Sequence, residues 1–265
     1  KHGLSCSVLA QQGEEMQRDY WYSSSRRAEG LADAQSVGRE AGRRSVARLG
    51  SRKLPTTECP VLFKADLAPS LLGNLLGAIR GPALYRRASF LLDQLGEAIF
   101  PDWVQIDEDP LLPQGLASAP FDNEGVATQA RQLIQNGILQ GYVLDSYAGR
   151  KLKLPSTGNA GGVRNVRIQD SGQDFATLVK QMHQGLVVTE LMGNGANLVT
   201  GDYSRGASGF WVENGEIQYP VEEITIASNL RKLFQGLQAV GNDNQIPSSV
   251  KTGSWLIDHM TIAGS

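Results

Sequence analysis

Three histidines and two cysteines are the side chains from which a metal or thiol site could be built. Zinc sites draw His, Cys and carboxylate ligands into a compact set, with HExxH on a helix as a common form. His2, His183 and His259 lie far apart in the sequence and none belongs to such a motif. Cys6 and Cys59 show no CxxC spacing. We therefore expect structural or surface roles for all three histidines.

Three loop-like segments could serve other chemistry. Residues 201–206 place a serine in a glycine-rich stretch, but they lack a GxSxG elbow, and a tight turn is the favoured interpretation. Residues 158–162 could cradle an anion, yet they lack the Gly-Lys-Ser/Thr ending of a phosphate loop. Residues 107–109 read as a solvated acidic loop. A Ser-His-Asp site assembled from distant positions stays open, but residue types alone indicate no active site.

Composition is typical of an ordinary globular protein. Of 265 residues, 41% are hydrophobic and 20% charged, and the net charge is −2. This charge offers no general attraction to nucleic acid or to an anionic membrane. No apolar run approaches the roughly 18 residues of a membrane helix, and two cysteines without pairing motifs favour a reducing compartment. We expect a cytoplasmic protein without membrane or nucleic-acid partners. Because the chain starts without methionine, we also expect an upstream segment that is absent here.

The first elements predicted are two strands and a basic helix. Residues 4–11 and 16–23 alternate as strands, and 33–49 form a helix with Asp33 as N-cap and Gly50 as stop. That helix carries four arginines in two pairs, each four residues apart, namely Arg39 with Arg43 and Arg44 with Arg48. We interpret them as a solvated face, with a nucleic-acid contact as the less favoured alternative.

Short strands and helices follow in the remainder. Strands are predicted at 59–64 and 103–106, and helices at 68–79, 90–100, 145–152, 174–184 and 228–239. Asn-Gly pairs at 136–137 and 214–215 lie between alternating residues and predict two-residue hairpins. The second hairpin would pair Val212 with Ile217 and Phe210 with Tyr219. The chain therefore reads as an α+β fold, β-rich, with many short and mainly antiparallel strands forming a curled sheet or open barrel and with peripheral helices.

Several segments resemble the PmbA/TldE family. They are MQRDYWY (16–22), FLLDQLG (90–96), GLASAPFD (115–122), VVTELMGNG (187–195), TGDYSRGASGFWVENGEIQYPV (200–221), EITIA (223–227), AVGND (239–243) and IAGS (262–265). They keep their order over nearly the whole chain. The resemblance implies two parts: residues 1–56, a strand pair and basic helix leading from a missing N-terminal domain, and residues 57–265, the β-rich C-terminal domain.

The chain resembles the TldD-type paralogues more loosely, through NGIL, TGN and VGND. Those paralogues carry zinc on a helical HExxxH motif and a cysteine near the C-terminus, where zinc activates water. Alignment on the following arginine pair and LG motif puts Gly73, Asn74 and Ala78 at the His, Glu and His positions, and Thr252 at the cysteine. The resemblance thus implies no catalytic residue and no cofactor in this chain, with zinc in a TldD-type partner.

The family further implies a non-catalytic subunit of a heteromeric zinc metalloprotease acting on unfolded and small peptides, with a homo-oligomer possible when the chain is alone. Two alternatives stay open: an independent metallopeptidase with an unrecognised site, and a regulatory module that modulates DNA gyrase. Extended peptides can be held by strand addition with little demand on sequence. The residues proposed to line a peptide channel are Thr157, Gly158, Asn159, Asp202, Ser204 and Arg205.

Overall fold

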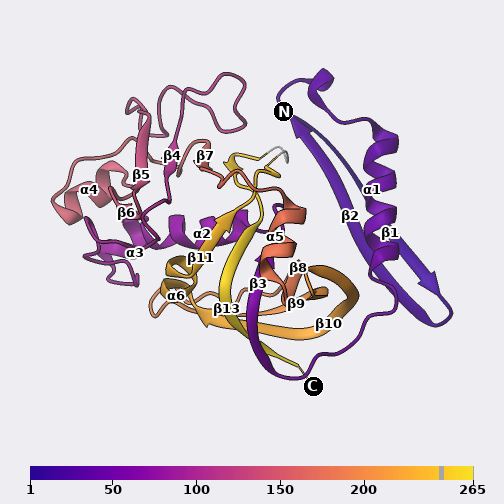
Figure 1. Cartoon of the computed structure of the whole chain (residues 1–265). Coiled ribbons are helices and arrows are strands. Elements are labelled where there is room, and N and C mark those ends of the chain that lie inside the picture. Colours follow the sequence, from indigo (N-terminus) through magenta and orange to yellow (C-terminus); the bar gives the residue numbers. More distant parts are fainter. Residues whose placement is uncertain (245–247, 265) are drawn as a thin grey trace.

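The first 49 residues form a compact substructure, termed here the hairpin unit. In the computed structural model, which describes residues 1–244 and 248–264, β1 (His2–Gln12) and β2 (Glu15–Ser25) pair antiparallel. A short 3₁₀ turn, η1 (Ala28–Gly30), precedes α1 (Ala34–Ala47), which packs on one face of the hairpin (Figure 1). The Asp33 carboxylate accepts a hydrogen bond from the Ser36 backbone N–H at 2.9 Å, so the predicted N-cap is confirmed.

Five strands close into a barrel beside this unit. In order around the ring they are β10 (Glu216–Asn229), β9 (Asp202–Glu213), β8 (Gly185–Met192), β3 (Thr57–Phe63) and β13 (Trp255–Ala263), and β13 pairs back with β10. The β3–β8 pair is parallel and the other pairs are antiparallel. A sixth strand, β11 (Leu237–Val240), extends the sheet from β13.

Parts of β3, β8 and β13 are buried on both faces. Phe63 and Trp255 belong to the main apolar core, whereas Leu62 belongs to a second cluster. That second cluster packs under α5 (Phe175–Met182), which covers the outside of the barrel. Side chains of successive strand residues point to opposite faces, so adjacent Leu62 and Phe63 serve the two clusters.

A smaller five-stranded sheet completes the fold. Its order is β12 (Val250–Lys251), β7 (Val166–Ile168), β4 (Ile106–Glu108), β5 (Arg131–Gln135) and β6 (Ile138–Leu139). The other helices are α2 (Pro69–Ala78), α3 (Gly81–Tyr85), α4 (Ser146–Leu152) and α6 (Leu230–Gln235). Within the described ranges, no helix combines the length and apolar character that crossing a membrane requires.

The predicted α+β, β-rich class with peripheral helices is confirmed, and the curled sheet closes. Both Asn-Gly hairpins form, with Asn136 and Asn214 at positive φ. One register detail was wrong: Val212 does pair with Ile217, but Phe210 lies opposite Pro220 because a bulge at Gln218 shifts the register.

The predicted helix over 90–100 is wrong, since these residues form turns. Asp93 and Gly96 adopt positive φ, which an α-helix does not accommodate. The backbone N–H groups of Phe90, Gly96 and Ile99 donate to distant carbonyls, those of Leu198, Leu139 and Gly137. The strand predicted at 103–106 begins only at Ile106.

Candidate functional site

Helix α2 carries Gly73, Asn74 and Ala78, the three positions that the sequence predicts to align with a metal-binding motif. Its buried face consists of Leu71, Leu72, Leu75 and Ala78. Gly73 is exposed, with open space where a side chain would begin. Asn74 is half-buried. Gly73 and Ala78 therefore have no side-chain atom that could bind a metal. Ala78 is also buried in the apolar core.

The fourth position, Thr252, follows β12, and β12 lies close to α2. The fold therefore brings the two parts of the aligned motif near each other. The Thr252 hydroxyl accepts a hydrogen bond from the Trp255 indole N–H at 2.6 Å and donates to the Gly253 carbonyl at 2.9 Å. Its hydrogen-bonding capacity is used within the protein, and a hydroxyl is a poor substitute for a thiolate toward zinc.

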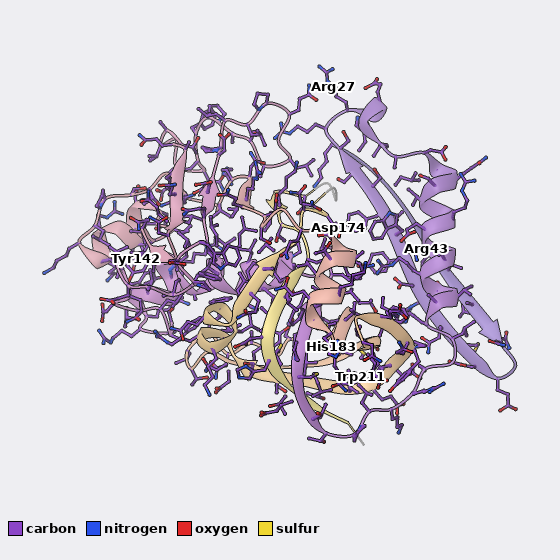
Figure 2. All side chains as sticks on the ribbon, in the orientation of Figure 1. Arg27, Arg43, Tyr142, Asp174, His183 and Trp211 are labelled. Carbon is purple, nitrogen blue, oxygen red and sulfur yellow. The ribbon has the colours of Figure 1, made fainter. Side chains whose placement is uncertain are left out.

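These residues do not fit a zinc ion. Zinc needs three or four nitrogen, sulfur or carboxylate ligands, and the four aligned positions supply none. Within residues 1–244 and 248–264, no three His, Cys, Asp or Glu side chains gather as a metal would require. The three histidines are all exposed: His2 lies on β1, His183 follows α5, and His259 contacts Asp258 at 3.1 Å. Asp174 and His183 flank the two ends of α5 (Figure 2).

The first candidate channel loop, 157–159, is tied into a buried polar network. The Asn159 amide donates to Glu108 Oε1 at 2.8 Å and accepts from the Arg131 guanidinium at 2.8 Å. The Thr157 hydroxyl accepts from the Leu144 backbone N–H at 2.8 Å. Gly158 has φ +69°, and a Cβ there would lie 2.7 Å from the Ala127 carbonyl oxygen. These contacts fix the small sheet, which favours a structural role for this loop.

The second candidate segment, 202–205, is not the loop that the sequence suggested. It opens strand β9, where Ser204 pairs with Ala227 and Arg205 with Ile226 on β10. The Asp202 carboxylate accepts from the Thr200 hydroxyl at 2.6 Å. The Arg205 Nε and the hydroxyl of neighbouring Tyr203 are buried and lack hydrogen-bond partners among the described residues. No hydrogen bond of the described part of the chain joins this segment to 157–159.

Sequence reasoning missed a charged cluster between the hairpin unit and the barrel. Arg44 is buried, with its Nε 3.2 Å from Asp19 and its Nη1 2.9 Å from Asp66, in ion-pair rather than hydrogen-bond geometry. Arg48 pairs with Glu190 on β8. Burial by itself lowers the pKa of Arg44, but Asp66 and Asp19 outweigh it and raise the pKa. The solvated-face interpretation was therefore wrong for these two arginines.

A signal for that burial was present in the sequence. Val37 and Ala41 are buried on α1, and positions 44 and 48 continue the same helical stripe at spacings of three and four. Arg43 falls outside the stripe and makes a surface ion pair with Glu40. Extending the apolar stripe by one turn would have placed Arg44 and Arg48 against a neighbouring element.

A closed barrel, the helix α2 that follows strand β3 and the small sheet together define a metallopeptidase-like scaffold. The chain belongs to the PmbA/TldD family. The family's "PmbA/TldA metallopeptidase C-terminal domain" matches residues 56–264, and its "PmbA/TldA metallopeptidase central domain" matches residues 1–49.

Individual proteins similar to this chain support the family assignment. The chain is 51% identical to "Metalloprotease PmbA" of Escherichia coli O157:H7, over 100% of this chain and 59% of that protein. A crystal structure of a candidate modulator of DNA gyrase from Bacteroides thetaiotaomicron superposes with a TM-score of 0.94 at 30% identity, covering 99% of this chain and 60% of the other. TldE from Thermococcus kodakarensis, at 22% identity, shares the fold (TM-score 0.85; 99% and 62% covered). The chain thus spans about three fifths of the length of these proteins.

Proposed function

We propose that the protein containing this chain is the metal-free subunit of a heteromeric zinc metalloprotease of the TldD/TldE type, which cleaves unfolded and small peptides in the cytoplasm. Zinc would reside in a TldD-type paralogue, where it would activate the attacking water. One observation carries the proposal: Gly73, Asn74, Ala78 and Thr252, at the four aligned positions, offer no zinc ligand.

The intact scaffold supports a role beyond catalysis. Leu71, Leu72 and Leu75 anchor α2 in the main core although α2 lacks the ligands. A subunit with this fold and without zinc ligands can still line a substrate channel and contact a partner of related structure. The proposal does not require the chain to bind nucleic acid or a membrane.

The first test measures metal content and cleavage of an unstructured fluorogenic peptide. The chain is assayed alone, with a TldD-type paralogue, and with a paralogue whose motif Glu is replaced by Gln. We expect a zinc-free, inert chain, faster cleavage by the mixture than by the paralogue alone, and no cleavage with the Glu→Gln paralogue. Light scattering of each sample reports self-association and the heteromer.

A matched variant tests the aligned positions. Asn74→Ala removes the one polar side chain that α2 presents there, and it should leave cleavage by the mixture unchanged. A stoichiometric metal and cleavage by the isolated chain would instead make it an independent peptidase. An effect on gyrase activity without any cleavage by the mixture would favour the regulatory module, an alternative that the name of the Bacteroides protein suggests.

A further inference from the structure

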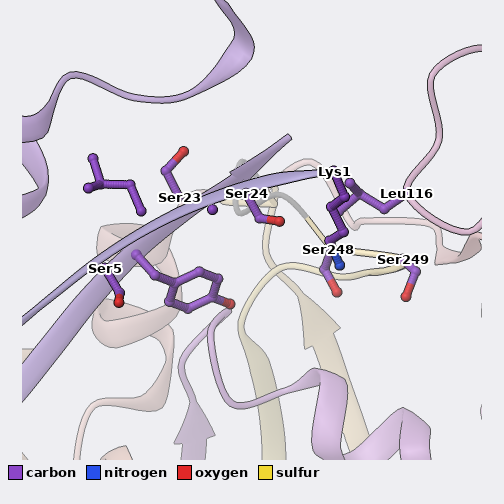
Figure 3. Close-up of a pocket in the computed structure, with 10 residues that line it drawn as sticks. Lys1, Ser5, Ser23, Ser24, Leu116, Ser248 and Ser249 are labelled. Carbon is purple, nitrogen blue, oxygen red and sulfur yellow. The ribbon is translucent and has the colours of Figure 1, made fainter. Parts of the chain in front are cut away.

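Three adjacent cavities lie between the hairpin unit and the rest of the chain, and we name them together the junction groove. Their volumes are about 390, 410 and 700 Å³. Ser5 lines the first and second, and Ser24 and Leu116 line the second and third, so they follow one another along the hairpin. Figure 3 shows the middle cavity, with Ser24 and Ser248 around it.

The walls of the groove are polar and mixed in charge. Hydroxyl groups recur along it, from Ser5, Ser7, Ser24, Ser25, Ser248 and Ser249. The cavity nearest α1 holds three arginines and three acidic residues, so it attracts neither sign of charge strongly. The groove follows β2 from Arg18 to the residue after its end, Arg26, which corresponds to roughly 25 Å at ~3.3 Å per residue. These properties suit the uncharged, repeating main chain of an extended polypeptide.

One wall of the groove is a strand edge with which no strand of residues 1–244 and 248–264 pairs. Strand β3 pairs with β8 only at Leu186, Val187 and Val188, after which β3 ends. Residues 189–191 of β8 continue along the cavity nearest α1 with β9 as their strand partner on the other side. A strand edge without a partner is a template for main-chain pairing with another segment.

The groove can widen, because the hairpin unit is held to the body by polar contacts. Neither apolar cluster of the described residues includes a member from 1–49. The contacts across the junction are the pairs Arg44–Asp66 and Arg48–Glu190 and the hydrogen bonds from Gln17 to Glu222 and Arg26 to the Ser118 carbonyl. A small polar interface of this kind permits relative motion of the parts it joins.

We propose that the junction groove binds an extended polypeptide segment, whose main chain pairs with residues 189–191 of β8 and with the hydroxyls of Ser5 and Ser7. Recognition through the main chain imposes little sequence demand. This inference deepens the proposed function, because it rests on unfolded peptides as the substrate class and assigns this subunit its own peptide site. It also moves that site away from 157–159 and 202–205.

The test is fluorescence anisotropy of a labelled, unstructured peptide with this chain alone, so that no proteolysis takes part. A second peptide of identical side chains carries N-methyl groups on alternate backbone nitrogens. We expect the first peptide to bind and the second to bind about tenfold more weakly or worse, since N-methylation removes main-chain donors. Equal binding of both peptides, or no binding of either, would overturn the proposal and leave the heteromer assay unaffected.

Variants locate the site. Ser7→Trp and Ser5→Trp place an indole in the groove from exposed positions of β1, and each should weaken peptide binding about tenfold or more. Gln140→Trp, at an exposed position directly after β6 of the small sheet, is the matched control and should bind normally. Circular dichroism melting verifies that each variant is folded. If Ser204→Trp abolishes binding while both groove variants bind normally, the site lies on β9 and the proposal is wrong.

Discussion

The barrel and the hairpin unit bury different kinds of side chain. Barrel strands bury Phe63, Trp255 and their apolar neighbours completely. The hairpin unit instead buries polar groups, among them Asp19, Arg44 and Ser45. Apolar contacts are non-directional and summed over a large area, whereas buried ion pairs depend on geometry and on both partners. The barrel therefore rests on a continuous apolar core, while the position of the hairpin unit depends on a few charged contacts.

Removing the Phe63 ring should have the largest effect. Phe63→Ala deletes a fully buried side chain at the C-terminal end of β3 and should cost about 3–5 kcal/mol of unfolding free energy. Urea unfolding followed by tryptophan fluorescence measures it. A loss below about 1 kcal/mol would mean that the barrel core can collapse around the gap.

Removing the Arg44 charge should loosen the junction. Arg44→Met leaves Asp19 and Asp66 without their shared cation and should cost about 3 kcal/mol. Hydrogen exchange should accelerate in β1, β2 and α1 while β3 and β8 stay protected. The matched control is Arg43→Met, whose exposed pair with Glu40 contributes only about 0.5 kcal/mol. Equal acceleration in the barrel would show that the two regions unfold as one.

The Ser45 hydroxyl should contribute less. It is fully buried, accepts from the Asp19 backbone N–H at 3.0 Å and donates within α1 or to β1. Ser45→Ala leaves that N–H unpaired and should cost about 1–2 kcal/mol. Hydrogen exchange at Asp19 reports it directly, and an unchanged rate would mean that another acceptor replaces the hydroxyl.

The smallest effect concerns pH in the barrel. Burial raises the pKa of Tyr203 from 10.0 to about 12, against the opposing influence of Arg205. The folded state therefore holds this proton more tightly than the unfolded state. Its contribution to stability is complete below pH 10 and is lost as the pH rises toward 12. Tyr203→Phe should flatten the decline in unfolding free energy between pH 10 and 11, measured by urea titrations. An unchanged slope would assign the decline to other groups.

Local signals predicted the elements whose causes are local. Asp33 caps α1 because its carboxylate reaches a backbone N–H three residues away. The Asn-Gly turns form because Asn and Gly tolerate the positive φ that a two-residue hairpin needs. The helix predicted over 90–100 failed for the opposite reason. Its apolar spacing is compatible with a helix, but carbonyls of Leu198, Leu139 and Gly137 capture its backbone donors.

The features of the candidate site also fall into those that the sequence could predict and those that it could not. The missing ligands at Gly73 and Ala78 were readable directly, because a side chain without a donor atom has none in any fold. The ion pair of Arg44, by contrast, depends on Asp66, which lies in the turn between β3 and α2. The unpaired edge at 189–191 depends on where β3 ends beside it.

By itself, the sequence determined the family, the α+β class, the local turns and caps, and the residue types at positions 73, 74, 78 and 252, since these follow from residue identity and short-range contacts. The tertiary structure alone decided that the sheet closes, that Asp66 and Glu190 meet the arginines of α1, and that a polar groove separates the hairpin unit from the barrel. The physical reason is that burial, closure and cavity shape are properties of pairs of segments distant in sequence, and their free energies arise only when those segments meet.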